Sequence, residues 1–390
     1  MKVFAIAALA IFCASAANWT DRKEYDLVLS IRAESSPLKR VTLLDEWKTK
    51  YPKSEYQEIR RELYFAAYQA MDDSAGMCAV AGEMLAAQPD STMGAYWFAL
   101  LLPEQKKPAQ DQLALGEKSA AVLLAGAKSQ AGAEWTAHRV LGWVHWRRGE
   151  NALAEEEFRK CLELNPNAVQ ISAWLGTLMG LEQKPEMRVP ALWQLARAAA
   201  YRGNGALPDV QQRQIANVLD RLYISYHGDN SGLDQLRISA AAKLYPPAGF
   251  DIENAATVAL RKQDEELSRT NPQLAAWVRI RQKLESPEGE KYFADNFQGK
   301  PLTRLKGTLI KCDPPGKPNE LTIGIVDPAQ PEVVLKLDTA FPNAAEPGTI
   351  LEFEGVGNAV AKGPFLLTLA TERAKISGWP AAPTARRSGK

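Results

Sequence analysis

Two of the three histidines in the sequence, His138 and His145, lie seven residues apart. On an α-helix this spacing is about two turns, or roughly 10 Å, which is too far for both imidazoles to bind one metal ion directly. No nearby cysteine and no HExxH motif completes a metal site. We therefore predict that both histidines pack within the structure and that the chain holds no metal.

The third histidine, His227, opens a polar turn in which Asp229 and Asn230 could hold a cation. This turn has too few acidic residues for a calcium loop, and its residue types are those that commonly end helices. The sequence also lacks a G-x-S-x-G motif, a P-loop and a G-x-G-x-x-G fingerprint. The run Glu155–Glu157 is typical of a solvated helix face. We expect neither catalysis nor a cofactor.

The segment from Trp135 to Pro166 is predicted to form two short helices with small and large residues at fixed positions. Small residues at helix contacts let two backbones approach closely, and glycine or proline commonly ends a helix. A Leu-Gly pair recurs 34 residues after the first one. The residues that define this packing pattern are Leu141, Gly142, Gly149, Ala154, Phe158, Pro166, Leu175 and Gly176.

This pattern resembles the tetratricopeptide repeat (TPR), whose signature is W-x2-L-G-x2-Y, A-x3-F and P with a period of 34 residues. The resemblance is clearest over residues 135–168 and weaker over about 55–245. Such helix pairs stack because one pair cannot bury its apolar face alone. The layout also resembles exported bacterial TPR proteins that have a C-terminal β domain and no assigned activity.

The resemblance implies that the first helix of each repeat lines a concave groove, with defined positions facing a ligand. Tryptophan and arginine are frequent at binding hot spots. The alternative is that Trp143 and Trp146 pack on a neighbouring helix pair or on the β domain. A clamp for a peptide carboxylate is not expected, because its asparagine position holds Val140 or Arg139. The predicted partner-binding residues are Thr136, Arg139, Trp143, Trp146 and Arg147, with Tyr96 on the preceding helix.

Changes in periodicity divide the chain into segments. An apolar run after Lys2, followed by small residues, predicts a secretory signal peptide. Five short extended runs near the C-terminus, separated by Pro, Gly, Asp and Asn, predict a small barrel of the OB type or a small sandwich. The predicted segments are 1–16 (signal peptide), 17–245 (TPR-like α-solenoid of antiparallel helix pairs), 246–300 (helical connector), 301–379 (β domain) and 380–390 (disordered tail).

The charge of the chain is nearly balanced, with 47 basic and 46 acidic residues. Such a chain has no general electrostatic attraction to nucleic acid. Cys78, Cys161 and Cys312 are odd in number and far apart, so they do not indicate a disulfide framework. No segment after the signal peptide is apolar over the length needed to cross a bilayer of about 30 Å.

Together these features predict an exported scaffold, periplasmic or secreted, that binds a protein or peptide on the concave surface of the solenoid. The alternative is a ligand-binding protein whose β domain holds a glycan or a small molecule. Nucleic-acid binding by the β domain is not expected, because Phe353 is flanked by Glu352 and Glu354 where cations would be needed.

Overall fold

The computed structural model describes residues 19–126, 132–182 and 184–381. The chain divides into two compact units, Met1–Ile252 and Glu253–Lys390. The expected signal peptide and residues 382–390 of the expected tail lie outside the described residues.

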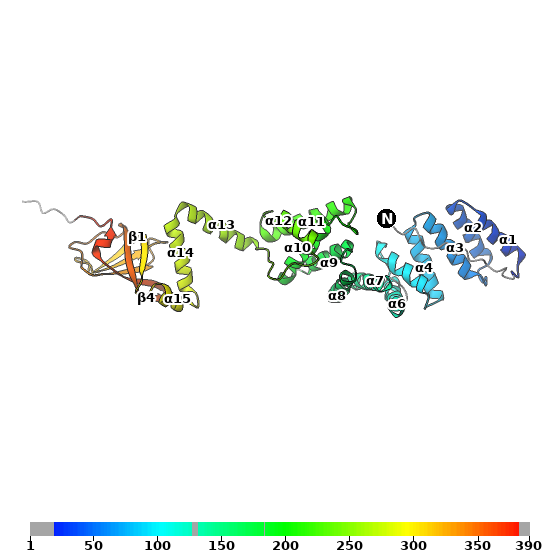
Figure 1. Ribbon diagram of the computed structural model, residues 1–390, viewed down its shortest axis with the longest axis horizontal. Helices are drawn as coiled ribbons and strands as arrows, with labels where there is room; N and C mark the ends of the chain where they lie inside the picture. The colour runs from blue at the N-terminus through cyan, green and yellow to red at the C-terminus, as the bar shows by residue number, and fades with distance from the viewer. Residues whose placement is uncertain (1–18, 127–131, 183, 382–390) are drawn as a thin grey trace, which may run out of the picture. The chain divides into compact units, whose positions relative to one another are not determined.

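The first unit, which we call the helical unit, is a series of consecutive helices (Figure 1). From α1 to α11 each helix packs against the next one in the chain, and α12 packs against α10. This order of contacts is that of a TPR-like solenoid, as predicted. Its helices are α1 (Arg22–Ala33), α2 (Pro37–Lys50), α3 (Gln57–Ala70), α4 (Ser74–Ala87), α5 (Thr92–Leu101), the 3₁₀ turn η1 (Leu102–Glu104), α6 (Gln110–Gly126), α7 (Ala133–Arg148), α8 (Asn151–Leu164), α9 (Val169–Leu181), α10 (Pro185–Ala200), α11 (Asp209–His227) and α12 (Leu233–Ala242).

The ends of these helices follow from local residue types. The side chains of Asp21, Asp73 and Ser91 accept hydrogen bonds from the first backbone N–H groups of α1, α4 and α5. Gly149 and Gly228 end α7 and α11 in the left-handed conformation, with φ of 79° and 98°. Aspartate and serine are preferred N-caps, and glycine is the residue that adopts positive φ without strain.

Two glycines 34 residues apart occupy equivalent contacts between paired helices. A Cβ atom added at Gly142 in α7 would lie 2.6 Å from the ring of Phe158 in α8. One added at Gly176 in α9 would lie 2.9 Å from the backbone nitrogen of Leu195 in α10. The repeated Leu-Gly pair therefore marks the close approach of two helices in successive pairs.

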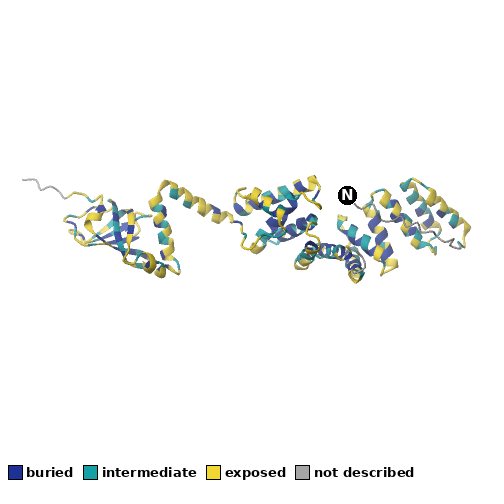
Figure 2. Cartoon of the chain, viewed as in Figure 1, coloured by how far each residue is buried: buried dark blue, intermediate teal, exposed yellow. Residues whose placement is uncertain are grey.

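The other residues of the packing pattern lie at the same contacts. Ala154, Phe158 and Leu175 are fully buried, and Leu141 is half-buried against the core. Pro166 follows Asn165, the residue that caps the C-terminus of α8. Figure 2 shows this apolar interior as the buried faces of the helices.

The start of α10 differs from the expectation. The sequence predicts a long turn over residues 183–189 and a helix that starts at Pro190, but α10 begins at Pro185 and contains Pro190. Pro185 suits the first position of a helix, where no intrahelical N–H bond is needed. The buried face that includes Leu192, Trp193 and Leu195 offsets the hydrogen bond that Pro190 cannot make.

The second unit, which we call the β unit, begins with three helices, α13 (Ala255–Thr270), α14 (Pro272–Glu285) and α15 (Gly289–Asn296). Arg279 of α14 joins α13 through hydrogen bonds to both carboxylate oxygens of Asp264, at 3.0 and 2.6 Å. Trp277, Leu284 and Phe293 enter the apolar core of the strands. From Glu253 onward, the expected connector belongs to the same compact unit as the strands.

The strands of the β unit close into a barrel. The sheet order is β1-β2-β3-β5-β4-β6, and an additional antiparallel pairing of β1 with β4 closes it. The pairing of β3 with β5 is parallel. A five-stranded barrel with one added short strand is OB-like. Of the two predicted architectures for this domain, the barrel is confirmed and the sandwich is wrong. The strands are β1 (Pro301–Asp313), β2 (Glu320–Gly324), β3 (Val333–Leu337), β4 (Ile350–Lys362), β5 (Phe365–Thr371) and β6 (Ile376–Ser377), with the 3₁₀ turn η2 (Arg373–Lys375) before β6.

One buried carboxylate ties α14 to the barrel. Glu332 is 1% exposed and precedes β3. It accepts hydrogen bonds from the backbone N–H groups of Ile325 (2.7 Å) and Val326 (2.6 Å) and pairs with Arg281 of α14. The Arg281 guanidinium also lies over the ring of Phe365 in β5, 5.3 Å from its centroid. A buried charge is tolerated when it is paired and hydrogen-bonded in this way.

Replacing Gly142 with Ala should destabilise the helical unit, because the new methyl group would overlap Phe158. Overpacking of this kind costs roughly 1–3 kcal/mol, and the gain in helix propensity offsets about 1 kcal/mol of it. We expect a lower midpoint of urea unfolding followed by circular dichroism. Gly180→Ala in α9 is the matched control, since its Cβ would meet only Leu222 at 3.8 Å. Equal midpoints for the two variants would contradict the close contact.

Replacing Arg281 with Ala should leave the Glu332 carboxylate buried without its cation. Removing one partner of a buried pair costs about 3 kcal/mol, which corresponds to roughly hundredfold faster exchange of the protected amides. Hydrogen exchange followed by mass spectrometry of peptides from β2 and β3 would measure this. Arg304→Ala is the control, because Arg304 is 48% exposed and its pairs with Glu352 and Glu354 lie on the surface. Unchanged exchange in Arg281→Ala would show that the pair is dispensable.

Candidate functional site

Three of the six predicted partner-binding residues are buried within the helical unit. Thr136, Arg139 and Trp143 of α7 are 2%, 7% and 6% exposed. The Thr136 hydroxyl donates a hydrogen bond to the carbonyl oxygen of Gly132, at 2.9 Å. These side chains have little surface with which to contact a partner.

Arg139 joins three successive helix pairs. Its Nη1 atom donates to the carbonyl oxygen of Leu100 at the end of α5 (3.0 Å), and its Nη2 atom lies 3.2 Å from a carboxylate oxygen of Glu104. On the other side, the guanidinium lies 5.2 Å from the ring centroid of Trp174 in α9. Burial lowers the pKa of Arg139, while the nearby Glu104 carboxylate acts in the opposite direction. Arg139 therefore holds neighbouring pairs together.

The other three predicted residues keep exposed surface. Arg147 is exposed at the end of α7, with its guanidinium 5.5 Å from the ring centroid of Trp143. Trp146 is half-buried and meets Phe158 edge-on, with ring centroids 6.3 Å apart. Tyr96 is half-buried on α5, where its ring meets that of Trp97 at 5.7 Å.

Three further tryptophans are half-buried and were not predicted to bind a partner: Trp97, Trp135 and Trp174. Trp174 directly precedes the second Leu-Gly pair, so the repeat period places it at the position of Val140, which is not one of the positions expected to face a ligand. With the three exposed or half-buried residues above, these tryptophans lie on the first helices of three consecutive pairs. We call this set of partly exposed side chains the α5–α7–α9 patch, and its members are Tyr96, Trp97, Trp135, Trp146, Arg147 and Trp174.

The two histidines of α7 bind carboxylates. His138 Nδ1 lies 2.6 Å from Oε2 of Glu157 in α8, and His145 pairs with Glu150 in the turn before α8. Burial tends to raise the pKa of Glu157, but hydrogen bonds from His138 and Lys160 outweigh it, and the pKa lies below its usual value. Among the described residues no group of His, Cys, Asp and Glu could hold a metal ion.

The expectation that the run 155–157 is a solvated face was wrong for most of its length. The Glu156 side chain is 60% exposed, but those of Glu155 and Glu157 are 17% and 12% exposed. The reason is that Glu157 faces His138 across the contact between α7 and α8. Helix periodicity alone does not show which neighbour covers a charged face.

The three cysteines of the described chain are free thiols. Cys161 is fully buried, and its Sγ atom lies 3.7 Å from the carbonyl oxygen of Trp135. Burial raises the pKa of Cys78 to about 11 and that of Cys161 to about 12. Both thiols therefore stay protonated at neutral pH, where only the thiolate would be nucleophilic.

Two cavities are notable in the described chain. The first, of about 310 Å³, lies between α2, α3 and α4, and the second, of about 420 Å³, lies at one end of the barrel. The barrel cavity has a mixed lining, with Lys336 and Lys375 opposed by Asp338 and Glu372. Its Thr371 hydroxyl is buried without a hydrogen-bond partner among the described residues. The balanced charge of this lining does not favour one class of ligand.

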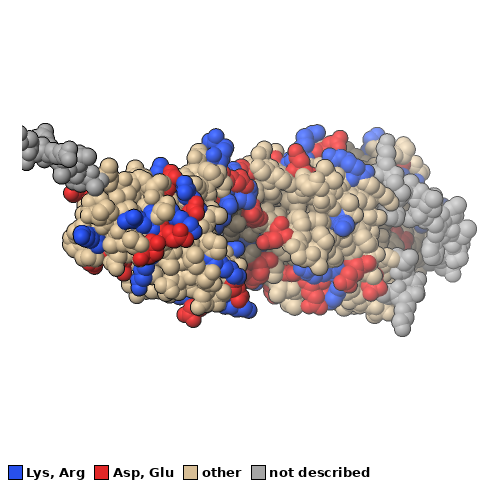
Figure 3. All heavy atoms as spheres, turned by 60° about the vertical axis from the view of Figure 1, so that its left-hand side comes forward, with Lys and Arg blue, Asp and Glu red and all other residues tan. Residues whose placement is uncertain are grey.

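The outer surface carries interspersed charges. Figure 3 shows basic and acidic side chains mixed on the face in view, without a large area of one sign. None of the described helices combines the length and the apolar character that crossing a membrane requires.

Comparison with known proteins gives distant similarities only. No known protein family matches the sequence, and no curated protein sequence matches it. A solved structure described as "MamA RS-1 ArsTM double mutant" is 14% identical, with a TM-score of 0.32, over 52% of this chain and 97% of that one. Another, described as "Functional Characterization of Pseudomonas Aeruginosa pilF", is 17% identical, with a TM-score of 0.31, over 70% and 96%. Similarity at this level says nothing of what the chain binds.

Replacing Arg139 with Met should destabilise the helical unit, because the Leu100 carbonyl would lose its donor and the contact with Trp174 would weaken. Hydrogen bonds from a charged group contribute roughly 1.5–3 kcal/mol, so the midpoint of urea unfolding should fall clearly. Glu104→Ala is the control: the Glu104 side chain is 59% exposed, and we expect a loss under about 1 kcal/mol. A larger loss in Glu104→Ala would show that the ion pair, and not the carbonyl contact, is the stabilising element.

Proposed function

We propose that this chain is an exported scaffold, without catalytic activity, that binds a protein or peptide through the α5–α7–α9 patch. The observation that carries the proposal is that several large aromatic side chains on successive first helices are only half-buried. Aromatic and arginine side chains are enriched in protein interfaces relative to the rest of the protein surface. Repeat proteins use such extended faces to bind partners.

The α7 residues fall into a buried group that packs between helices and a more exposed group, and this difference supports the proposal. Arg139 and Trp143 are buried and hold the neighbouring helices in place. Trp146 and Arg147, about one turn after Trp143, are more exposed. The Arg147 guanidinium lies over the ring of the buried Trp143. A rigid aromatic anchor loses little conformational entropy on binding, which favours affinity.

The proposed export rests on the composition of residues 1–16, where a short apolar run follows Lys2 and precedes Ala14-Ser15-Ala16. A signal peptide of this kind would direct the chain across a membrane and be removed by cleavage before Ala17. The partner would then be an envelope or secreted protein.

Affinity capture with the full chain as bait, followed by quantitative mass spectrometry of envelope proteins, tests the patch. Truncating a hot-spot residue costs about 2 kcal/mol, which corresponds to roughly thirtyfold weaker binding. We therefore expect Trp146→Ala combined with Arg147→Ala to lose the proteins that the wild-type chain captures. Arg147→Glu alone, which changes an exposed side chain, should lose them as well.

Arg213→Ala combined with Ile224→Ala on α11 is the matched control, because it removes one exposed arginine and one exposed apolar side chain elsewhere in the same unit. This control should capture the same proteins as the wild-type chain. Circular dichroism melting of each variant shows whether the helices are intact. Capture that is unchanged by both patch variants would refute the proposal.

A further inference from the structure

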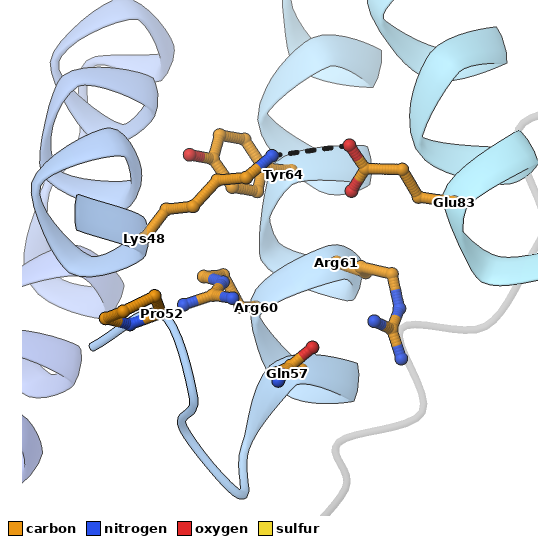
Figure 4. Close-up of a pocket in the computed structure, with 7 residues that line it drawn as sticks. All are labelled: Lys48, Pro52, Gln57, Arg60, Arg61, Tyr64 and Glu83. Carbon is orange, nitrogen blue, oxygen red and sulfur yellow. Dashed lines mark hydrogen bonds and ion pairs between the residues drawn. The ribbon is translucent and has the colours of Figure 1, made fainter. Parts of the chain in front are cut away.

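The cavity between α2, α3 and α4 has a strongly cationic lining. Three of its side chains, Lys48, Arg60 and Arg61, are basic, and only Glu83 is acidic, so the formal charge of the lining is +3 − 1 = +2. Figure 4 shows Lys48 crossing toward Glu83 on one side of the cavity, with Arg61 and Gln57 on the other. The remaining lining residues are Pro52 and Tyr64.

Part of this lining is held in place by its own contacts. Arg60 is 6% exposed, and its Nη1 atom donates to the carbonyl oxygen of Tyr51, at 3.0 Å. Its guanidinium lies 5.6 Å from the ring centroid of Trp47. The Tyr64 hydroxyl donates to the carboxylate of Asp45 at 2.6 Å, which fixes the orientation of this lining residue. The cavity is therefore a preorganised feature of the three helices.

The rest of the lining has donors that no described residue uses. Neither Arg61 nor Gln57 has a side-chain hydrogen bond or ion pair with another described residue. The one ion pair within the lining, between Lys48 and Glu83 at 3.3 Å, joins two side chains that are more than half exposed. Burial lowers the pKa of Arg60, and the positive charge of Arg61 acts in the same direction, whereas Tyr64, Glu24 and Glu83 act against it. An anion in the cavity would relieve this repulsion.

We propose that the α2–α4 cavity binds a dianionic oxyanion of the phosphate class. Guanidinium groups present forked donors that match phosphate oxygens, and a phosphate monoester carries a charge of about −1.5 to −2 at neutral pH. That charge balances the lining, whereas one carboxylate would leave a cation uncompensated. The volume of about 310 Å³ suits either a free phosphate with water or the phosphoryl group of a small ester. The cavity shares no residue with the α5–α7–α9 patch, so the two proposals stand independently.

Isothermal titration calorimetry of the full chain tests this site, with inorganic phosphate, glycerol 3-phosphate and acetate as separate probes. We expect saturable binding of a phosphate probe at millimolar concentrations or below, and binding of acetate that is at least roughly tenfold weaker. Arg61→Ala should weaken phosphate binding by about tenfold or more, because it removes one charge-assisted hydrogen bond to the anion. Arg61 is half-exposed, so its removal should leave the fold intact, which circular dichroism verifies.

Arg213→Ala on α11 is the matched control and should bind phosphate as the wild-type chain does. Tighter binding of glycerol 3-phosphate would support the proposal and identify an ester as the ligand, and tighter binding of inorganic phosphate would support it and identify the free ion. The proposal is overturned if neither phosphate probe saturates, if acetate binds equally well, or if Arg61→Ala leaves phosphate binding unchanged.

Discussion

The stacking of the helical unit depends on buried arginines that bind the carbonyl ends of neighbouring helices. Each of them directs its guanidinium at carbonyl oxygens in the last turn or cap of another helix and lies over an aromatic ring. The partial negative charge at a helix C-terminus attracts a cation. The three contacts are Arg60 with Tyr51, Arg139 with Leu100, and Arg197 with Ala240 and Ala241.

Burial lowers the pKa of all three arginines, because removing a guanidinium from water is unfavourable. The hydrogen bonds to the carbonyl oxygens offset this desolvation cost only when the neighbouring helices lie at the distance that lets these bonds form. Arginine suits this role better than lysine, since its planar group can donate several bonds and stack at the same time. Arg197 illustrates this, because it also donates to Pro166 (2.9 Å) and lies 4.8 Å from the ring centroid of Tyr201.

The sequence predicted the helix pair in 135–166 and the change from helices to strands, because apolar periodicity and helix-capping residues are local signals. That helix pair is α7 and α8, and the five expected strands are β1 to β5. Which side chains of α7 are buried was harder to predict from the sequence. The residues expected to face the groove were chosen by their position in the repeat, but the packing of α5 and α9 against Arg139, which buries it, is a tertiary property. The cationic cavity was not predicted for the same reason, since Lys48, Arg61 and Glu83 come from three helices and form no motif.

The closure of the barrel affects the order in which the chain can fold. In the helical unit each pair contacts its sequence neighbours, so pairs can form one after another as the chain is synthesised. The barrel differs, because β1 needs β4 and β3 needs β5 as partners. Contacts between distant segments slow folding, since the intervening chain must be ordered first. The edge of β1 therefore stays open until β4 is available and that of β3 until β5 is available, so the barrel is the last part of the described chain to become complete.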